Sequence, residues 1–153
     1  MSQDLRNLIK KHEGLRLKPY LCTEGKLTIG YGRNLDATGI VGKEAEIILS
    51  EGISEQAAEF LLENDIVKAH GELKLNIPYW DELSEVRRAV LVDMCFNLGL
   101  RGLLKFKRMF LALKEDRYKD AAKEMLDSTW ATQVKGRANE LAFMMREDKY
   151  QST

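Results

Sequence analysis

The sequence predicts an α+β protein that is mainly helical, with a small β-hairpin near its N-terminus. Three observations lead to this fold class. Apolar residues recur at helical spacing in residues 2–13, alternate with polar or small residues in 15–32, and return to helical spacing after a glycine-rich passage. One helix and a hairpin are therefore followed by about six helices. The simplest architecture is a small α+β lobe, a connecting helix and an all-helical lobe.

The first helix and the hairpin have clear boundary signals. Ser2 is a suitable N-cap for the helix, and Gly14 is suited to end it. Residues 23–26 form a turn signal between two alternating runs, which predicts a β-hairpin. Pro19 lacks a backbone N–H, so we expect the first strand to lie at an edge of the sheet.

Helical patterns account for the rest of the chain. A short helix is predicted at residues 43–50, and Ser54 caps a longer one that ends near Gly71. Ser84 caps a strongly apolar helix that continues through Phe96. Three further helices are predicted at residues 105–114, 117–127 and 136–146.

Composition and charge narrow the possible functions. Of 153 residues, 44% are hydrophobic and 31% charged, which is ordinary for a soluble globular protein. Basic and acidic residues number 24 each, and this balance argues against a dedicated nucleic-acid binder. The N-terminal residues lack the apolar core of a secretory signal, and no run approaches the ~20 apolar residues of a membrane span. We therefore expect a soluble product made in the cytoplasm.

The charges are unevenly placed along the chain. Residues 44–65 hold seven acidic residues and no Lys or Arg, whereas residues 101–123 hold eight basic residues and three acidic ones. The simpler interpretation is that both segments form solvated helix faces. The alternative is that the basic segment attracts an acidic polymer.

Three polar residues around the hairpin are candidates for catalysis. Eight residues separate Glu13 from Cys22, and five separate Cys22 from Thr28. A hairpin that folds back under the helix end would bring all three together. Each also has an ordinary explanation, as a surface charge, a small buried apolar residue and a residue of high β propensity. The residue types alone favour these ordinary explanations.

The remaining cysteine and the histidines give weaker signals. Cys95 lies in the apolar helix and is expected to pack in the core. A thiol-hydrolase pair of His12 and Cys22 lacks an identifiable residue to orient the imidazole. His12 and His70 are far apart and no Cys/His cluster exists, so no structural metal site is predicted.

The motifs around the hairpin resemble those of one known family, the phage-type lysozymes or endolysins. The resemblance is carried by residues 12–20, 22–25 and 27–32 and covers about residues 5 to 150. Further matching positions are Ser54, Asp65, Trp80–Leu83, Val86–Ala89, Phe96–Gly99, Trp130, Gln133, Arg137 and Ala138.

The resemblance implies a lysozyme-like fold with two lobes and a cleft. Residues 14–54 would form the small lobe and residues 55–72 the connecting helix. Residues 73–153, together with the helix at 2–13, would form the helical lobe. Arg33, directly after the hairpin, matches a position that pairs with Asp65 on the connecting helix, so we expect an ion pair between them. Because arginine stays charged, this pair should fail only when Asp65 is protonated.

The implied activity is that of a muramidase. Such an enzyme hydrolyses the β-1,4 bond between N-acetylmuramic acid and N-acetylglucosamine in peptidoglycan. By resemblance, Glu13 is the general acid, Arg137 pairs with it, and Thr28 helps to hold the attacking water. Phe96 and Asn97 match positions that contact the substrate, where Asn97 would bind an N-acetyl group.

Cys22 stands where other members of the family have Asp or Cys, and its role is open. It could act as a base toward water, giving inversion, or as a nucleophile, giving retention. It could also be a weakly polar spacer. We rank the base or water-positioning role first, because a thioglycosyl intermediate would be slow to break.

The resemblance also indicates what the protein works with. No metal or cofactor is implied, and we expect a monomer that acts on bacterial peptidoglycan, without nucleic acid and without stable membrane insertion. Release from the host cytoplasm to the cell wall or periplasm would depend on a holin-type membrane lesion. The alternative function is a non-catalytic peptidoglycan-binding or helical interaction protein.

Overall fold

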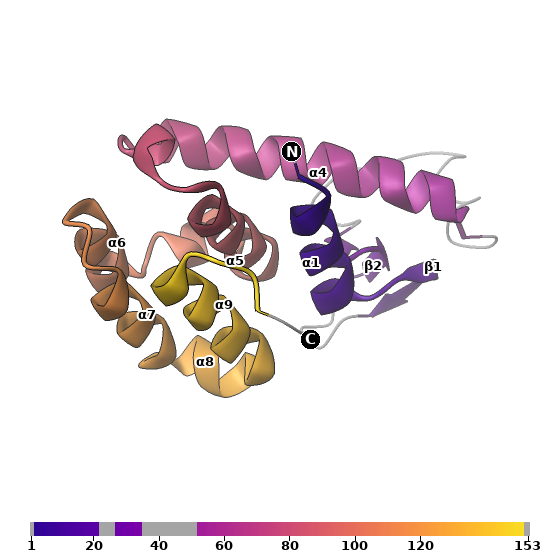
Figure 1. The fold of residues 1–153 in the computed structure, drawn as a ribbon. Helices are drawn as coiled ribbons and strands as arrows, with labels where there is room; N and C mark the ends of the chain where they lie inside the picture. Colours follow the sequence, from indigo (N-terminus) through magenta and orange to yellow (C-terminus); the bar gives the residue numbers. More distant parts are fainter. Residues whose placement is uncertain (1, 22–26, 35–51, 152–153) are drawn as a thin grey trace. The chain divides into compact units, whose positions relative to one another are not determined.

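A computed structural model describes residues 2–21, 27–34 and 52–151, and confirms the α+β class (Figure 1). The chain divides into two compact units, Met1–Lys68 and Ala69–Thr153. The helix predicted at 43–50 lies outside the described residues. The elements are α1 (Gln3–Glu13), β1 (Arg16–Leu21), β2 (Leu27–Gly30), β3 (Arg33–Asn34), α4 (Glu55–Asn76), the 3-10 helix η1 (Trp80–Glu82), α5 (Glu85–Leu103), α6 (Lys107–Lys114), α7 (Tyr118–Leu126), α8 (Thr129–Val134) and α9 (Gly136–Glu147).

The first unit begins with the predicted helix and hairpin. Ser2 Oγ accepts a hydrogen bond from the Leu5 N–H at 3.2 Å, and Gly14 ends α1 with a φ of 71°. The sheet is antiparallel in the order β1-β2-β3, so β1 is an edge strand as its proline requires. The register shifts between Arg16 and Tyr20, the stretch that contains Pro19. The sequence did not predict β3, which has only two residues.

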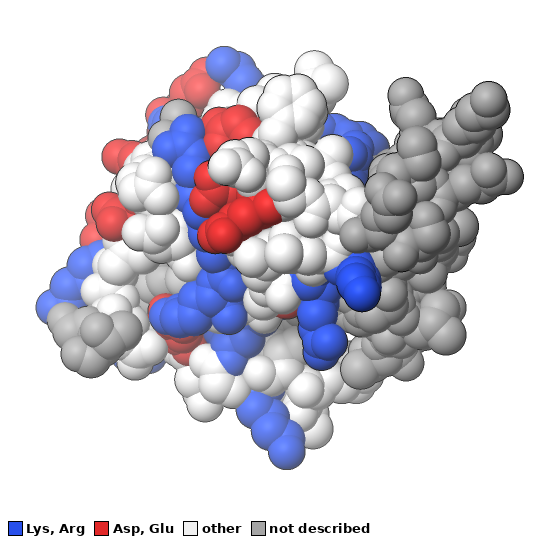
Figure 2. All heavy atoms as spheres, turned by 90° about the vertical axis from the view of Figure 1, so that its right-hand side faces the viewer, with Lys and Arg blue, Asp and Glu red and all other residues white. Residues whose placement is uncertain are grey.

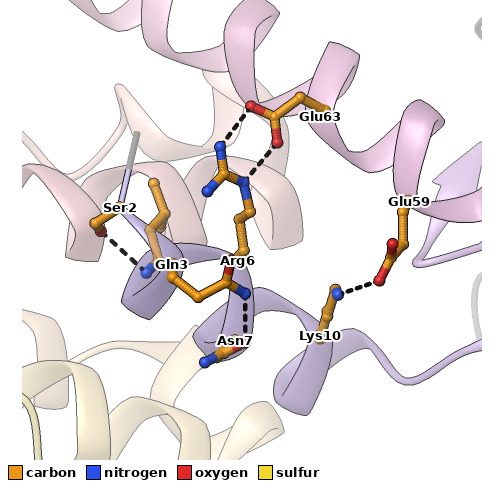
Figure 3. Close-up of polar contacts among 8 residues, drawn as sticks. Ser2, Gln3, Arg6, Asn7, Lys10, Glu59 and Glu63 are labelled. Carbon is orange, nitrogen blue, oxygen red and sulfur yellow. Dashed lines mark hydrogen bonds and ion pairs between the residues drawn. The ribbon is translucent and has the colours of Figure 1, made fainter.

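Ion pairs join α1 to the first half of α4 (Figure 3). Arg6 Nε lies 2.7 Å from Glu63 Oε2, and Lys10 Nζ lies 2.6 Å from Glu59 Oε1. Buried apolar residues of this unit, among those that the structure describes, come from α1, the hairpin region and α4. They are Leu5, Leu8 and Ile9 from α1, Ile29 and Tyr31 from the hairpin region, and Ala58, Leu62 and Ile66 from α4. Part of the acidic segment is thus tied to cations of α1. On the face shown in Figure 2, acidic and basic side chains likewise lie next to one another.

The connecting helix α4 begins as predicted and ends later. Ser54 Oγ accepts from the Ala57 N–H at 3.0 Å, which caps the helix. The helix then continues through Gly71 to Asn76. Its apolar face explains the extension, because Leu73 is fully buried and Ile77 nearly so. A glycine ends a helix when it adopts a left-handed conformation, and Gly71 is not among the glycines with positive φ.

The second unit is built around a larger apolar core. Ser84 Oγ caps α5 by accepting from the Arg87 N–H at 3.1 Å, and Cys95 is buried on this helix as predicted. The predicted helices at 105–114, 117–127 and 136–146 correspond to α6, α7 and α9. The sequence did not predict η1 and α8, which are too short for a periodic pattern. The largest fully buried side chains here are Trp80, Leu73, Leu91, Met94, Leu103, Met109, Leu113, Met125 and Leu141.

Candidate active site

Glu13 lies at the junction between α1 and the sheet. It is the last residue of α1, it is half-buried, and its carboxyl group lies against the turn that follows β2. A Cβ atom at Gly32 would lie 2.7 Å from Glu13 Oε2. Gly32 also has a φ of +79°, a conformation that other residues rarely adopt. The backbone conformation therefore favours glycine here, and a side chain at this position would displace the Glu13 carboxyl group.

The last turn of α1 carries groups of both signs. The C-terminus of a helix has a partial negative charge. Lys10, Lys11 and His12 lie in the same turn, and Lys10 is bound by Glu59. The Lys10 ammonium also lies 5.5 Å from the centre of the Tyr31 ring.

Thr28 lies in the middle of the sheet. It is only 4% exposed, and its Cα pairs in register with Tyr20 of β1 and with Asn34 of β3. The two neighbouring strands, β1 and β3, therefore hold the Thr28 backbone from both sides. Cys22, the third candidate, lies outside the described residues, so its predicted position beside Glu13 and Thr28 stays a prediction.

The predicted pair of Arg33 and Asp65 is confirmed. Arg33 Nε lies 3.5 Å from Asp65 Oδ1, but the buried Nε forms no hydrogen bond in the described part of the chain. Burial raises the pKa of Asp65, and the nearby charges of Arg33 and Lys68 offset this only in part. Asp65 is therefore protonated at a higher pH than a free aspartate. Arg33 belongs to β3, so the pair links the sheet itself to α4.

In the second unit, Asn97 is held by a tryptophan. Trp130 Nε1 donates a hydrogen bond of 2.6 Å to Asn97 Oδ1, and the Trp130 ring contacts Phe106 edge-on at 5.9 Å between ring centres. Phe96, the other predicted sugar contact, is half-buried on the same helix, α5. Trp130 matched the family by position, but sequence reasoning did not assign it a contact with Asn97. The bond orients the amide and directs Nδ2 away from the indole.

A buried ion pair in the second unit involves Arg137. Its Nε donates to Asp93 Oδ1 at 2.9 Å, and its Nη2 donates to the Asp93 backbone carbonyl at 3.2 Å. The Asp93 side chain is fully buried, and that of Arg137 is 11% exposed. Asp93 is the residue that the sequence analysis missed, because a lone acid within an apolar helix has no local signal. The pairing of Arg137 with Glu13 remains a prediction.

Residues 2–21, 27–34 and 52–151 contain no cluster of three or more His, Cys, Asp or Glu side chains that could hold a metal ion. Within the same ranges, none of the helices combines the length and apolar character needed to cross a bilayer.

Comparison with known proteins decides the family. The model of the phage lysozyme family matches residues 10–147. The chain belongs to the phage lysozyme family. This confirms the resemblance of the hairpin motifs. Membership makes the protein a lysozyme-type glycoside hydrolase, and peptidoglycan is the substrate that the family implies.

Individual relatives agree with this assignment. Probable T4-type lysozyme 1 of Dictyostelium discoideum is 29% identical over 91% of both chains. The pre-baseplate central spike protein Gp5 of Enterobacteria phage T4 is 29% identical over 94% of this chain, which spans only 28% of that protein's length. The endolysin of Bacillus phage B103 is 33% identical over 82% of this chain and 44% of its own. This lysozyme therefore matches one relative over nearly its whole length and two longer ones over only part of theirs.

Proposed function

We propose that this lysozyme hydrolyses the β-1,4 bond between N-acetylmuramic acid and N-acetylglucosamine, with Glu13 as the general acid. The single observation that carries the proposal is the placement of the Glu13 carboxyl group at the end of α1, against Gly32 of the hairpin turn. A general acid must be held at a fixed position relative to the leaving oxygen. A helix end and a turn that admits no side chain hold Glu13 in this way.

The reaction needs one group that donates a proton to the leaving oxygen and another that accepts a proton from the attacking water. The protonated Glu13 carboxyl donates its proton to the glycosidic oxygen as the bond from that oxygen to the anomeric carbon breaks. Positive charge develops on the sugar ring, and water then attacks the anomeric carbon. In the proposed assignment, Thr28 helps to hold this water, and Cys22 positions it or accepts its proton.

Cys22 is a less effective base than a carboxylate unless its thiol is ionised. An ordinary cysteine has a pKa of about 8.5, so only a small fraction is thiolate near neutral pH. The base role therefore predicts that activity rises with pH in the range where the thiol ionises. The nucleophile role predicts a sugar bound to sulfur, and the spacer role predicts neither result.

Phe96 and Asn97 are proposed to contact the sugar chain. Asn97 suits this role because Trp130 holds its carbonyl oxygen and so orients the Nδ2 donor. An amide oriented in this way can donate to the carbonyl oxygen of an N-acetyl group. Arg137 is proposed to support the acid, with Asp93 fixing the guanidinium that would do so.

The decisive experiment replaces Glu13. The variant Glu13→Gln keeps the shape of the side chain and removes the proton donor, so hydrolysis of purified peptidoglycan should fall at least about 100-fold. Glu72→Gln serves as the control, because Glu72 is half-buried like Glu13 but lies on α4 within the second unit. A Glu13→Gln variant with near wild-type activity would remove Glu13 from the mechanism. Binding to peptidoglycan without hydrolysis by the wild-type chain would favour the non-catalytic alternative.

A second experiment distinguishes the roles of Cys22. Cys22→Asp should retain substantial activity if the residue acts as a base, because a carboxylate can take the same proton. Cys22→Ser cannot ionise, so it should lose activity under both thiolate roles and little under the spacer role. The first product decides between the thiolate roles: an α-anomer supports a base, whereas a β-anomer with a sugar trapped on Cys22 supports a nucleophile.

Two further parts of the proposal concern how the protein reaches the cell wall and how many copies of the chain act together. We propose that the protein is made in the host cytoplasm and reaches peptidoglycan after a holin-type lesion opens the membrane. We also propose that it acts as a monomer. Expression with and without a holin, followed by measurement of lysis, tests the first point. Sedimentation of the purified chain tests the second.

A further inference from the structure

A shallow apolar groove lies in the second unit, and none of the residues that line it is assigned to catalysis. Its volume is about 370 Å³, and its walls come from the segment after α4 and from α6. Ile77, Pro78 and Tyr79 line one side, and Phe110 and Leu111 line the other. Tyr79 Oη donates a 2.9 Å hydrogen bond to the Phe110 carbonyl, which joins the two walls. The groove is therefore part of the folded structure.

An exposed leucine lines this groove. Leu111 is 54% exposed and belongs to the wall that α6 forms. Most exposed apolar side chains are isolated, but a leucine on the wall of an apolar groove enlarges the apolar surface that the groove presents.

Lysines flank the exposed leucine of α6. Lys107, Leu111 and Lys114 are spaced by four and three residues, so they share one face of the helix. Both lysines line the groove, and neither has an ion-pair partner among the residues that the structure describes. The nearby acids are already engaged, since Asp81 lies 3.7 Å from Lys74 and Glu115 lies 2.7 Å from Arg117. The surface therefore combines apolar side chains with uncompensated positive charge.

We propose that the groove surface, defined as Lys107, Leu111 and Lys114, binds the face of an anionic lipid bilayer. The Leu111 side chain enters the boundary between headgroups and acyl chains, and the lysine stems extend so that their ammonium groups contact lipid phosphates. Lipid phosphates supply negatively charged partners, which Lys107 and Lys114 lack among the residues that the structure describes. This is peripheral attachment, and it needs no helix that spans the membrane.

The exposure of Leu111 favours a bilayer over an acidic amphipathic helix as the partner. A helix bound in a groove places its own apolar side chains into the groove of its host. Here an exposed leucine of this chain forms part of the groove wall, in a position to enter another apolar phase. The acidic helix and a second copy of the chain are therefore outcomes that the test must separate from lipid binding.

The test measures binding of the full chain to vesicles by co-sedimentation. Vesicles of equal parts phosphatidylglycerol and phosphatidylcholine should bind the protein, and phosphatidylcholine vesicles should not. Each lysine near an anionic surface strengthens binding about fivefold, so Lys107→Glu/Lys114→Glu should weaken binding at least about 20-fold. Lys119→Glu/Lys123→Glu, on α7, makes the same change in net charge and should weaken binding much less. Equal losses in the two double variants would overturn the proposal in favour of unspecific charge attraction.

The apolar contribution has its own matched pair of variants. Leu111→Asn should weaken vesicle binding severalfold, whereas Leu126→Asn, at a 42% exposed leucine of α7, should not. Absence of binding to the anionic vesicles at low salt would overturn the proposal. Tighter binding to an acidic helical peptide than to vesicles would also overturn it, as would dimerisation lost in Leu111→Asn.

A final measurement separates this surface from the catalytic proposal. Hydrolysis of lipid-free peptidoglycan should be the same for wild type, Leu111→Asn and Lys107→Glu/Lys114→Glu. A loss of that hydrolysis would assign the groove to the substrate and overturn the membrane role. Glu13→Gln should bind vesicles like the wild type, so failure of one proposal leaves the other intact.

Discussion

Different interactions are prominent inside each of the two units. Among the residues that the structure describes in the first unit, charged side chains of α1, β3 and α4 pair with one another, as with Arg6 and Glu63. In the second unit, helices bury large side chains such as Trp80 and Leu141 completely or nearly so. The proposed acid, Glu13, lies in the unit whose described elements are joined by these partly exposed charge pairs.

This difference has a consequence for how solution conditions act. Exposed ion pairs weaken as salt screens them, whereas burial of apolar surface does not. Salt and pH should therefore affect the first unit before the second. Activity should respond to these conditions more strongly than the overall helical content does.

The largest expected effect concerns the buried ion pair between Asp93 and Arg137 in the second unit. Asp93→Ala leaves Arg137 without its buried partner, which typically costs about 3–5 kcal/mol in the free energy of unfolding. Asp120→Ala, which removes an exposed partner of Arg117, should change stability little. Urea denaturation measures both. If Asp93→Ala is no worse than Asp120→Ala, the second unit does not depend on this pair, and the contrast between the units becomes sharper.

An intermediate effect is expected at the turn beside Glu13. Gly32→Ala adds a methyl group at 2.7 Å from Glu13 Oε2 and forces a non-glycine residue into positive φ, at a cost of about 1–2 kcal/mol. Gly14→Ala also forces alanine into positive φ, but nothing lies within 4 Å of its added methyl group. Both variants should lose stability, and Gly32→Ala should lose more activity for a given loss of stability. Equal losses of activity would show that the contact with Glu13 is unimportant.

The smallest effect concerns Asp65 and its pH dependence. The pKa of Asp65 is raised in the folded protein by burial, so the folded state keeps this proton at pH values where the unfolded state has released it. The resulting stability is complete below the unfolded value of about 3.9 and is lost as pH rises through the folded value. Asp65→Asn should therefore gain stability relative to wild type as pH rises from 3 to 7, which urea denaturation at each pH measures. A relative loss over this range would show that attraction to Arg33 outweighs burial.

Local features were predictable from the sequence. Ser2, Ser54 and Ser84 each cap the helix that they were expected to cap, because capping depends on a side chain and a backbone only three residues apart. The same locality explains the error at Gly71. The sequence shows a glycine that could end a helix, whereas the fold shows buried Leu73 and Ile77 that extend it.

Contacts between distant segments were predictable only through the family. Arg33 and Asp65 are 32 positions apart in sequence numbering, and nothing in their immediate neighbours predicts the pair. The contact of Gly32 with Glu13 and that of Asp93 with Arg137 have no matching signal in the sequence, because they depend on how helices and turns pack. The roles of Glu13, Cys22 and Thr28 likewise remain predictions that the proposed experiments test.

The methionines of the second unit have a consequence for oxidation. All residues of this type beyond Met1 lie there, and each is fully buried: Met94, Met109, Met125, Met144 and Met145. Peroxide reaches a thioether only when solvent does, so sulfoxide forms during opening of the core. Each sulfoxide is polar and fits poorly among apolar helices, which makes the next opening more frequent. Oxidation of these methionines in this enzyme should therefore accelerate once begun, and it should spread through the helical unit from one thioether to the next.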